Sequence, residues 1–195
     1  MEIAILPVNA ETLVEYSTIS SRFEVGLRLV IELLYDGLGG IVFHEENVEP
    51  PYIKDYDRLK GEGTTRWPKR FNTDNWGMFI AREGGKPVGG AVAAFRTPEV
   101  YLLDAREDLV LLWDIRVQPE RRRCGIGAAL FAEVVRWSRE RGCTRLKVET
   151  QNVNVPACRF YVRQGCKLAE IGRFHYAEPQ VADEVMLIWY LDIKG

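Results

Sequence analysis

Residues 113–127 have the sequence Trp113-Asp-Ile-Arg-Val-Gln-Pro-Glu-Arg-Arg-Arg-Cys-Gly-Ile-Gly127. This stretch contains the end of an apolar run, a basic segment and two glycines. Residues 109–117 are rich in Leu, Val and Ile, which predicts a central strand buried on both faces. Residues 125–141 change to helical spacing, with Ile126, Leu130 and Val134 on one face. The pattern therefore predicts a strand, a tight basic turn and a helix that begins at the glycines.

The predicted start of this helix is suited to binding an anion. The N–H groups of a first helical turn have no partner within the helix, and the helix dipole adds positive charge there. Gly125 and Gly127 carry no side chain that would keep a diphosphate from the backbone, and Arg121, Arg122 and Arg123 add charge. The alternative interpretation is that two glycines stand at an ordinary helix start and that the three arginines are simply exposed to solvent. The spacing matches neither a P-loop nor the dinucleotide fingerprint.

Further strands and one short helix are predicted on both sides of this stretch. Glycine-rich turns at 36–40 and 84–87 each join two β-rich runs, so we expect two hairpins. Pro50 and Pro51 are expected to break the chain before a charged loop at 52–70. The predicted strands are 3–8, 27–35, 41–44, 76–82, 88–95, 109–117, 146–150, 167–173 and 184–191, with a short helix at 154–164. This order predicts an α/β chain of the α+β type, with a mixed sheet flanked by helices.

The whole-chain features favour one domain without a metal or a nucleic-acid partner. The 195 residues fit a single domain, 1–195, with an acceptor-side part at 1–75 and a core at 76–195. A formal net charge of −2 argues against nucleic-acid binding. The four cysteines have no CxxC spacing and only two histidines accompany them, so no metal site is expected. With no secretory start and no apolar stretch near the roughly 18 residues of a membrane span, we expect a cytoplasmic protein.

Three motifs resemble those of the GNAT superfamily of N-acetyltransferases. Arg122-Arg-Cys-Gly-Ile-Gly127 fits the family signature [RQ]-x-x-G-x-[GA], and Val117 to Arg122 fits its V-x-P-E-x-R. Val148-Glu-Thr-Gln151 is similar to the family's fifth strand, and 154–161 with Gly165 to its N-x-x-A-x-x-F-Y helix. The resemblance covers about residues 88 to 192. It implies a GNAT fold, a mostly antiparallel sheet of about seven strands with a V-shaped splay between the fourth and fifth strands.

A narrower resemblance points to the streptothricin acetyltransferase branch of this superfamily. It rests on residues 149–161, 188–191 and 51–56. It implies transfer of an acetyl group from acetyl-coenzyme A to a primary amine of a small molecule, a streptothricin-like antibiotic or a polyamine. Two other functions stay open: acetylation of a protein N-terminus or lysine, and a catalytically silent domain that senses acyl-coenzyme A.

The resemblance also implies which residues would hold acetyl-coenzyme A, in a site built between Trp113 and Tyr161. Ile115 and Val117 would contact pantetheine through main-chain atoms, the helix start would hold the pyrophosphate, and Asn154 would bond the cofactor arm. The implied cofactor contacts are Ile115, Arg116, Val117, Arg122, Arg123, Cys124, Gly125, Ile126, Gly127, Ala128, Asn154, Ala157 and Tyr161.

The resemblance suggests an acid for the transfer, whereas the base stays open. Tyr161 matches the family tyrosine near the cofactor sulfur, where a phenol can donate a proton to the leaving thiolate. Many family members have Glu where this chain has Trp113, which cannot accept a proton. Strand alternation predicts Trp113 and Ile115 on one face and Asp114 on the other. Asp114, Glu149 and a water chain are therefore alternative candidates for the base.

The acceptor side is expected among aromatic and acidic residues. Trp113 could form the floor of the pocket and hold a cation by its ring face. Tyr52, His175 and Tyr176 are further candidates for the pocket lining. Residues 44–49, with Asp55 and Asp57, would attract a polycation or form a solvated loop. Tyr56, Trp67 and Trp76 are either pocket walls or loop packing, and the last strand, with Trp189 and Tyr190, is either core or the face of a homodimer.

Overall fold

The computed structural model describes residues 3–59, 63–179 and 181–193. The chain divides into two compact units. The first unit contains residues 1–22, 55–148 and 190–195, and the second contains residues 23–54 and 149–189. The single-domain interpretation of the sequence stays a prediction.

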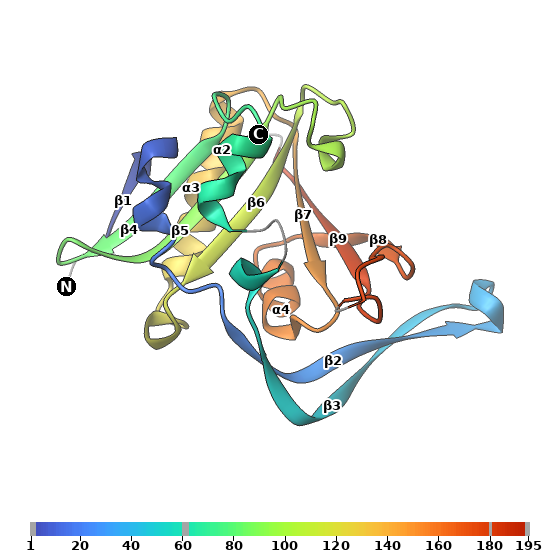
Figure 1. Ribbon diagram of the computed structural model, residues 1–195. Helices are drawn as coiled ribbons and strands as arrows, with labels where there is room; N and C mark the ends of the chain where they lie inside the picture. The colour runs from blue at the N-terminus through green and yellow to red at the C-terminus, as the bar shows by residue number, and fades with distance from the viewer. Residues whose placement is uncertain (1–2, 60–62, 180, 194–195) are drawn as a thin grey trace. The chain divides into compact units, whose positions relative to one another are not determined.

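Among the described residues, seven strands form one sheet in the order β1-β4-β5-β6-β7-β9-β8 (Figure 1). The pairs β1–β4, β4–β5 and β5–β6 are antiparallel, and β6–β7 is parallel. The strands are β1 (Ile3–Val8), β4 (Gly77–Glu83), β5 (Lys86–Phe95), β6 (Leu109–Val117), β7 (Arg145–Gln151), β8 (Lys167–Gly172) and β9 (Met186–Asp192). The prediction of a mixed, mostly antiparallel sheet of about seven strands is confirmed, with strand ends that differ by a few residues.

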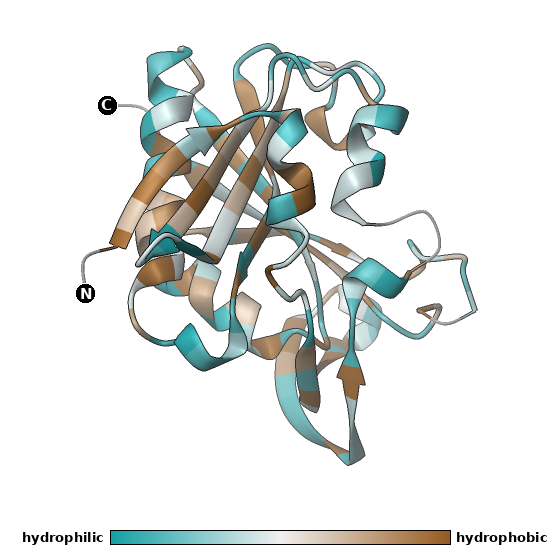
Figure 2. Ribbon diagram, turned by 60° about the vertical axis from the view of Figure 1, so that its left-hand side comes forward, coloured by the Kyte–Doolittle hydropathy of each residue, from teal (hydrophilic) through white to brown (hydrophobic). Residues whose placement is uncertain are grey.

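Two adjacent glycines of β5 let helices approach both faces of the first unit's strands. A Cβ atom on Gly89 would lie 2.9 Å from Ile126 of α3 (Ile126–Glu140), and one on Gly90 would clash with Tyr16 of α1 (Leu13–Tyr16). Neighbouring strand residues point to opposite faces, so α3 covers one face and α1 the other. Figure 2 shows hydrophobic residues in brown along these strands, which form the core between the two helical layers.

Two features of β6 position the predicted site. The β6–β7 pairing runs from Leu109–Arg145 to Leu112–Val148, and β6 continues beyond it to Val117. The main chain of 113–117 therefore extends past the parallel ladder, as the predicted splay requires. The pairing of β5 with β6 shifts register between Asp114 and Leu112, which places a β-bulge at Trp113.

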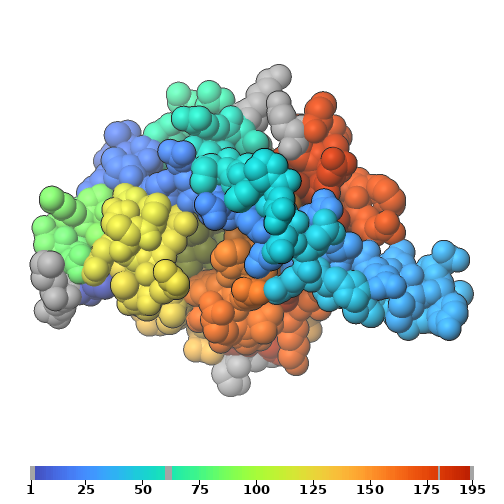
Figure 3. Space-filling view, turned by 90° about the horizontal axis from the view of Figure 1, so that it is seen from below, coloured from blue at the N-terminus to red at the C-terminus, as the bar shows by residue number. Residues whose placement is uncertain are grey.

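The second unit contains a two-stranded ribbon, β2 (Phe23–Leu34) and β3 (Gly40–Lys54), together with α4 (Val155–Arg163). The Leu29 N–H donates to the Asn152 carbonyl, and the Asn152 side-chain amide donates back to the Leu29 carbonyl, both at 2.9 Å. These bonds hold the middle of the ribbon beside the turn before α4. The far end of the ribbon, in light blue in Figure 3, extends beyond the orange and red residues of the same unit.

The predicted break at Pro50 and Pro51 is wrong, because β3 continues to Lys54. Leu27 pairs with Asn47 and Val25 with Tyr52, so both prolines lie in an irregular stretch opposite Gly26. A proline without an N–H is tolerated where the ladder is already interrupted. The short elements were not predicted because they span too few residues to show a period: α1, α2 (Trp67–Arg70) and the 3₁₀ turns Ala10–Thr12, Tyr35–Gly37, Tyr56–Arg58, Thr64–Arg66, Tyr101–Leu103 and Pro119–Arg121. None of the described helices is long and apolar enough to cross a membrane.

Candidate functional site

The turn from β6 into α3 has the geometry of an anion-binding helix start. Gly125 is the N-cap of α3, with φ of +83°, and its position provides no side-chain cap. A Cβ atom built on Gly125 would meet nothing within 4 Å, so the space in front of the helix is open. The N–H groups of the first turn have no partner within the helix. The first unit therefore presents an uncapped, positively polarised helix end.

The three arginines of this turn have different surroundings. Arg121 pairs with Glu83 of β4. Arg122 donates to the carbonyls of Val117 at 3.0 Å and Arg22 at 2.6 Å, and burial lowers its pKa. Arg123 is exposed, with φ of +62°. Arg121 and Arg122 thus brace the turn, and the exposed guanidinium of Arg123 is the one best placed to meet a ligand in solution.

The other predicted cofactor residues of the first unit lie around this turn. Cys124 is exposed and its thiol lies 3.5 Å from the Arg122 carbonyl, whereas Ile126 is buried in the first turn of α3. Gly127 and Ala128 are partly exposed in the same turn. Ile115 and Val117 are half-buried, and Val117 pairs with Gly89, which faces α3.

Asp114 and Arg116 belong to a buried polar network on the α1 face. Nε and Nη2 of Arg116 donate to the two oxygens of Asp114 at 2.8 and 3.0 Å, and Nη1 donates to Asp57 at 2.8 Å. The Tyr16 hydroxyl donates to Asp114 as well, at 2.5 Å. Burial disfavours the charge of Arg116, but Asp114, Tyr16 and Asp57 together outweigh this effect and the pKa of Arg116 rises. The Asp114 carboxylate is therefore occupied by three donors within the protein.

The predicted separation of Trp113 from Asp114 across the strand is wrong. The Trp67 ring lies 6.0 Å from that of Tyr16 and 6.3 Å from that of Trp113, with edge-to-face geometry in both pairs. Because Tyr16 bonds Asp114, the Trp113 ring and the Asp114 carboxylate share one side of β6. The bulge at Trp113 is the reason, since two residues of β6 oppose one of β5 there and the alternation is interrupted.

Trp113 is part of an aromatic cluster with Trp67, Phe71 and Trp76. Its ring centroid lies 5.2 Å from Phe71 and 5.3 Å from Trp76. The Trp76 indole donates to Thr97 at 2.8 Å, whereas the buried Trp67 Nε1 has no partner among the described residues. Trp67 and Trp76 are both buried. The burial of Trp67 and Trp76 therefore favours packing over a role as pocket walls. Phe71, the fourth member of the cluster, was not identified from the sequence.

In the second unit, α4 presents the remaining predicted cofactor residues. The Asn154 side chain caps the helix by accepting a hydrogen bond from the Ala157 N–H at 3.2 Å. Tyr161 is buried, and its ring lies 5.4 Å from that of Phe160. Asn154, Ala157 and Tyr161 are spaced i, i+3 and i+7, so they lie on one face of α4.

Glu149 is held by a small hydrogen-bonded cluster in the second unit. The Tyr176 hydroxyl donates to Glu149 Oε1 at 2.6 Å, and the Gln151 amide donates to the same oxygen at 3.3 Å. Gln151 also donates to the Tyr176 hydroxyl at 2.8 Å. His175 is exposed, and its ring lies 5.1 Å from that of Tyr176. The structure thus brings together Glu149 and Tyr176 and adds Gln151, which sequence reasoning had not assigned a role.

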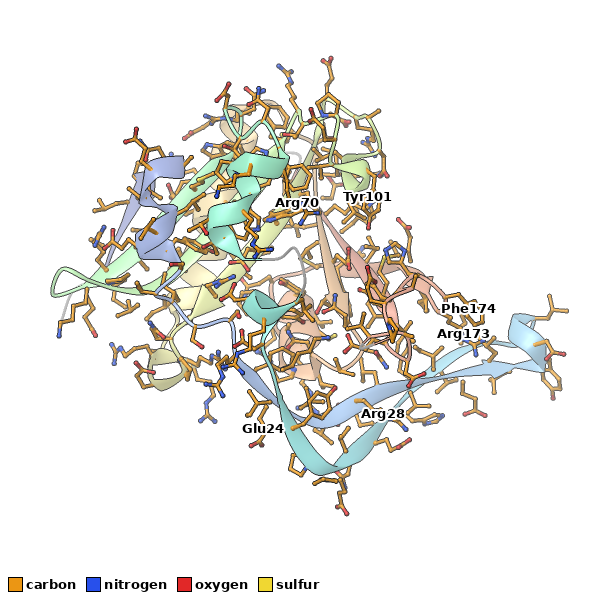
Figure 4. All side chains as sticks on the ribbon, in the orientation of Figure 1. Glu24, Arg28, Arg70, Tyr101, Arg173 and Phe174 are labelled. Atoms are coloured by element: carbon orange, nitrogen blue, oxygen red, sulfur yellow. The ribbon has the colours of Figure 1, made fainter. Side chains whose placement is uncertain are left out.

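These residues follow an exposed turn after β8. Arg173 lies over the ring of Phe174, which is 92% exposed, and both are labelled in Figure 4. The turn leads directly into His175 and Tyr176.

The acidic stretch at 44–49 belongs to strand β3, so the alternative of a loop is wrong, although most of its residues are exposed. Glu45 pairs with Arg159 at 2.5 Å and Glu46 with Arg28 at 2.6 Å. His44 lies 2.5 Å from Glu32. Basic side chains therefore offset much of the negative charge that was considered as an attractor for a polycation.

Tyr52 and a buried ion pair lie at the end of β3. Tyr52 is 43% exposed, and partial burial together with the charge of Glu184 raises its pKa. Lys54 and Glu184 are both 7% exposed and pair with each other. Burial lowers the pKa of Lys54. The Lys54–Glu184 pair could not be predicted from the sequence, because its members are 130 residues apart.

Comparison with known proteins places this geometry in a family. Streptothricin acetyltransferase A of Bacillus subtilis (strain 168) is 31% identical over 80 residues, which are 41% of this chain and 46% of that protein. Streptothricin acetyltransferase of Escherichia coli is 34% identical over 93 residues, 47% of this chain and 53% of that protein. The chain thus spans about half the length of these curated relatives.

Two solved structures share the fold over nearly the whole chain. Nourseothricin acetyltransferase has a TM-score of 0.77 at 21% identity, with 100% of both chains covered. A Bacillus anthracis str. Ames protein, solved in complex with acetyl coenzyme A, has a TM-score of 0.76 at 26% identity, with 98% of both chains covered. In addition, residues 42–166, more than half of the chain, match the model of the acetyltransferase (GNAT) family. The chain therefore belongs to the acetyltransferase (GNAT) family.

Proposed function

We propose that this chain transfers an acetyl group from acetyl-coenzyme A to a primary amine of a small molecule, and that the acceptor is a streptothricin-like antibiotic or a polyamine. The observation that carries the proposal is the start of α3, where Gly125 has φ of +83° and faces open space. An uncapped helix end with a glycine N-cap fits a pyrophosphate. The resemblance to streptothricin acetyltransferases supports the choice of acceptor.

The first unit would contribute the anion-binding part of the cofactor site. The N–H groups of Ile126, Gly127 and Ala128 would bond the pyrophosphate oxygens, and Arg123 would supply a mobile positive charge. Arg122 would act indirectly, because its guanidinium ties the turn to the carbonyls of Val117 and Arg22. The main chain of Ile115 and Val117 continues past the parallel ladder and would contact the pantetheine arm.

Glu149 and Tyr161 would act as the base and the acid. Bound acetyl-coenzyme A supplies the acetyl group as a thioester, whose C–S bond breaks as the C–N bond to the acceptor forms. Glu149 would take the proton from the acceptor ammonium, since both of its donors bond Oε1 and Oε2 can face the amine. Tyr161 would donate a proton to the departing sulfur. Asn154 would fix the first turn of α4 and thereby position Ala157 and Tyr161.

Asp114 would be a positioning residue in this scheme. Its carboxylate accepts hydrogen bonds from Tyr16 and from two nitrogens of Arg116, so its oxygens are already used within the protein. Trp113 would meet the cationic acceptor with its ring face. Tyr52, His175 and Tyr176 would line the acceptor side in the second unit.

The proposal is tested by measuring thiol release from acetyl-coenzyme A with a panel of amines: streptothricin, aminoglycosides, polyamines, lysine and short peptides. We expect turnover with streptothricin or polyamines. Tyr161→Phe should lower kcat by about 10²-fold or more, the usual contribution of a general acid. Tyr35→Phe is the matched control, because Tyr35 is 86% exposed in the ribbon turn. Binding of acetyl-coenzyme A without turnover on any amine would instead indicate a sensor domain, and turnover on peptides alone would indicate a peptide acetyltransferase.

The roles of the two carboxylates are separated by the pH dependence of kcat/KM. Glu149→Gln should lower the rate by about 10²-fold and remove the acidic limb of the profile, because the general base is lost. Asp114→Asn should lower stability and keep that limb. The opposite result, a limb that survives Glu149→Gln and disappears with Asp114→Asn, would reverse the assignment.

A further inference from the structure

The second unit contains an apolar pocket that the proposed transfer does not use. Its volume is about 400 Å³, within the range of sites for small organic ligands. Its apolar lining comes from Leu29 of β2, Phe43 of β3, Val155 and Val162 of α4, Leu168 of β8 and Trp189 of β9. At about 30 Å³ for each heavy atom, this volume would hold a ligand of roughly a dozen heavy atoms.

The pocket lies on a different face of α4 from the residues assigned to acetyl-coenzyme A. Val155, Cys158 and Val162 line it and repeat at i, i+3 and i+7. Asn154, Ala157 and Tyr161 repeat in the same way, one residue earlier along the helix. With 100° of rotation for each residue, the two stripes face different directions. A ligand in the pocket would therefore occupy a second site.

Trp189, which lines this apolar pocket, carries a buried hydrogen-bond donor without a partner among the described residues. The Trp189 side chain is 6% exposed and lines the pocket. Its buried Nε1 has no hydrogen-bond partner among the described residues. An indole N–H is donor only, and leaving it buried and unsatisfied has a free-energy cost. A ligand oxygen that accepts this proton would recover much of that cost.

The charged residues of the lining favour an anion. Arg159 and Arg163 contribute two positive charges and Glu45 one negative charge. Glu45 is paired with Arg159 at 2.5 Å, which leaves Arg163 as the exposed excess charge. Cys158 adds no negative charge, because burial raises the pKa of its thiol to about 12. The pocket therefore combines an apolar wall that includes Trp189 with a net positive rim.

We propose that this pocket binds a small monocarboxylate with an apolar tail, of the size of a medium-chain fatty acid. The tail packs against Leu29, Phe43 and Val162, the carboxylate accepts the Trp189 N–H, and Arg163 supplies the opposite charge at the rim. The proposal does not depend on acetyl transfer, and its test measures binding alone.

The test is a calorimetric titration of the full chain with decanoate. We expect saturable binding of one decanoate per chain and at least tenfold weaker binding of 1-decanol, which has the same tail and no charge. Absence of saturable binding, or equal affinity for the acid and the alcohol, would overturn the proposal.

Four variants locate the site. Val162 is 55% exposed on α4, so Val162→Asp should fold and abolish binding by placing a charge against the tail. Val14→Asp is the matched control, on the exposed side of α1, where Val14 is 69% exposed, and should bind decanoate normally. Trp189→Phe removes the N–H and should weaken binding about fivefold, as expected for one hydrogen bond. Arg163→Glu should weaken binding about tenfold and remove its dependence on salt.

Two results in this series contradict the proposal. Normal binding by Val162→Asp would place decanoate elsewhere on the chain. Sedimentation that shows a dimer, which Val162→Asp dissociates and decanoate does not, would identify a second copy of the chain as the occupant. If Trp189→Phe does not fold, as judged by circular dichroism, Val162→Asp and Arg163→Glu decide the question, because both residues lie at the surface.

Discussion

The hydroxyl of Tyr16 donates a hydrogen bond of 2.5 Å to Oδ2 of Asp114, 98 residues further along the chain. Tyr16 is fully buried in α1, and Arg116 joins the same carboxylate to Asp57. One buried network therefore fastens α1, β6 and the 3₁₀ turn Tyr56–Arg58 within the first unit. It also supplies three hydrogen-bond donors to the carboxylate next to Trp113 in the chain.

Removing the hydroxyl should destabilise the first unit. Tyr16→Phe keeps the ring and deletes one of three donors to the half-buried Asp114 carboxylate, and a hydrogen bond to a charged group contributes about 1.5–3 kcal/mol. Urea unfolding should show a loss of this size in the free energy of unfolding. Tyr35→Phe, in the exposed ribbon turn, should change it by less than about 0.5 kcal/mol. Equal stability of the two variants would contradict the importance of the network.

The raised pKa of Tyr16 predicts that the protein loses stability at alkaline pH. Burial and the charge of Asp114 raise the pKa of Tyr16 well above its usual value. Above about pH 10 the unfolded chain releases the Tyr16 proton and the folded chain keeps it, so the unfolded state binds fewer protons and stability falls as pH rises. Unfolding between pH 9 and 11 should show a steeper decline for the natural chain than for Tyr16→Phe. Parallel curves would argue against the shift.

Gly125→Ala should separate backbone strain from ligand binding. Gly125 has φ of +83° and Gly84, in the β4–β5 turn, has φ of +56°, and a Cβ atom on either would meet nothing within 4 Å. Both Ala variants should therefore lose about 1 kcal/mol of stability from the left-handed backbone. Only Gly125→Ala should weaken acetyl-coenzyme A binding, because its methyl group enters the space before α3. Equal binding by both variants, measured by calorimetry, would remove the helix start from the cofactor site.

Replacing one member of the Lys54–Glu184 pair should lower the stability of the protein strongly, whereas replacing both members should lower it much less. Lys54→Met leaves Glu184 buried without its partner, a change that typically costs about 3–5 kcal/mol. The double variant Lys54→Met/Glu184→Leu removes both charges and should recover most of that loss. A thermal unfolding series of the single and double variants measures the coupling. Additive losses would show that the two side chains act independently.

Trp113→Leu should weaken binding of the acceptor and leave acetyl-coenzyme A binding unchanged. The ring packs against Phe71 and Trp76, so a loss of about 1–3 kcal/mol in stability is also expected. If the ring face holds a cation, KM for the amine should rise about tenfold, and Trp113→Phe should restore much of the difference. An unchanged KM for the amine in Trp113→Leu would exclude the cation–π role.

The fold and the cofactor motif could be predicted because each depends on local sequence. The run 109–117 predicted β6 with its observed ends, and the helical spacing after Gly125 predicted α3 to within one residue. The bulge at Trp113 could not be predicted, because it depends on how β6 pairs with β5. Because of this bulge, the side chains of Trp113 and Asp114 lie on the same side of β6, whereas strand alternation predicts opposite sides. The prolines at 50 and 51 were misread for a similar reason, since the partner strand tolerates an irregularity at Gly26.

Local sequence was sufficient to predict the order of the strands together with α3 and α4, the glycine N-cap of α3 and the family of the chain. These features follow from hydrophobic period, turn chemistry and a motif of adjacent residues, all of which act over a few positions. The folded structure was needed to show that the Tyr16 hydroxyl bonds Asp114 and that Tyr176 and Gln151 bond Glu149. It was also needed to show that Trp189, with its unsatisfied N–H, lines an apolar pocket. Each of these depends on residues far apart in the chain, and their meeting is set by strand register and packing, which local sequence does not encode.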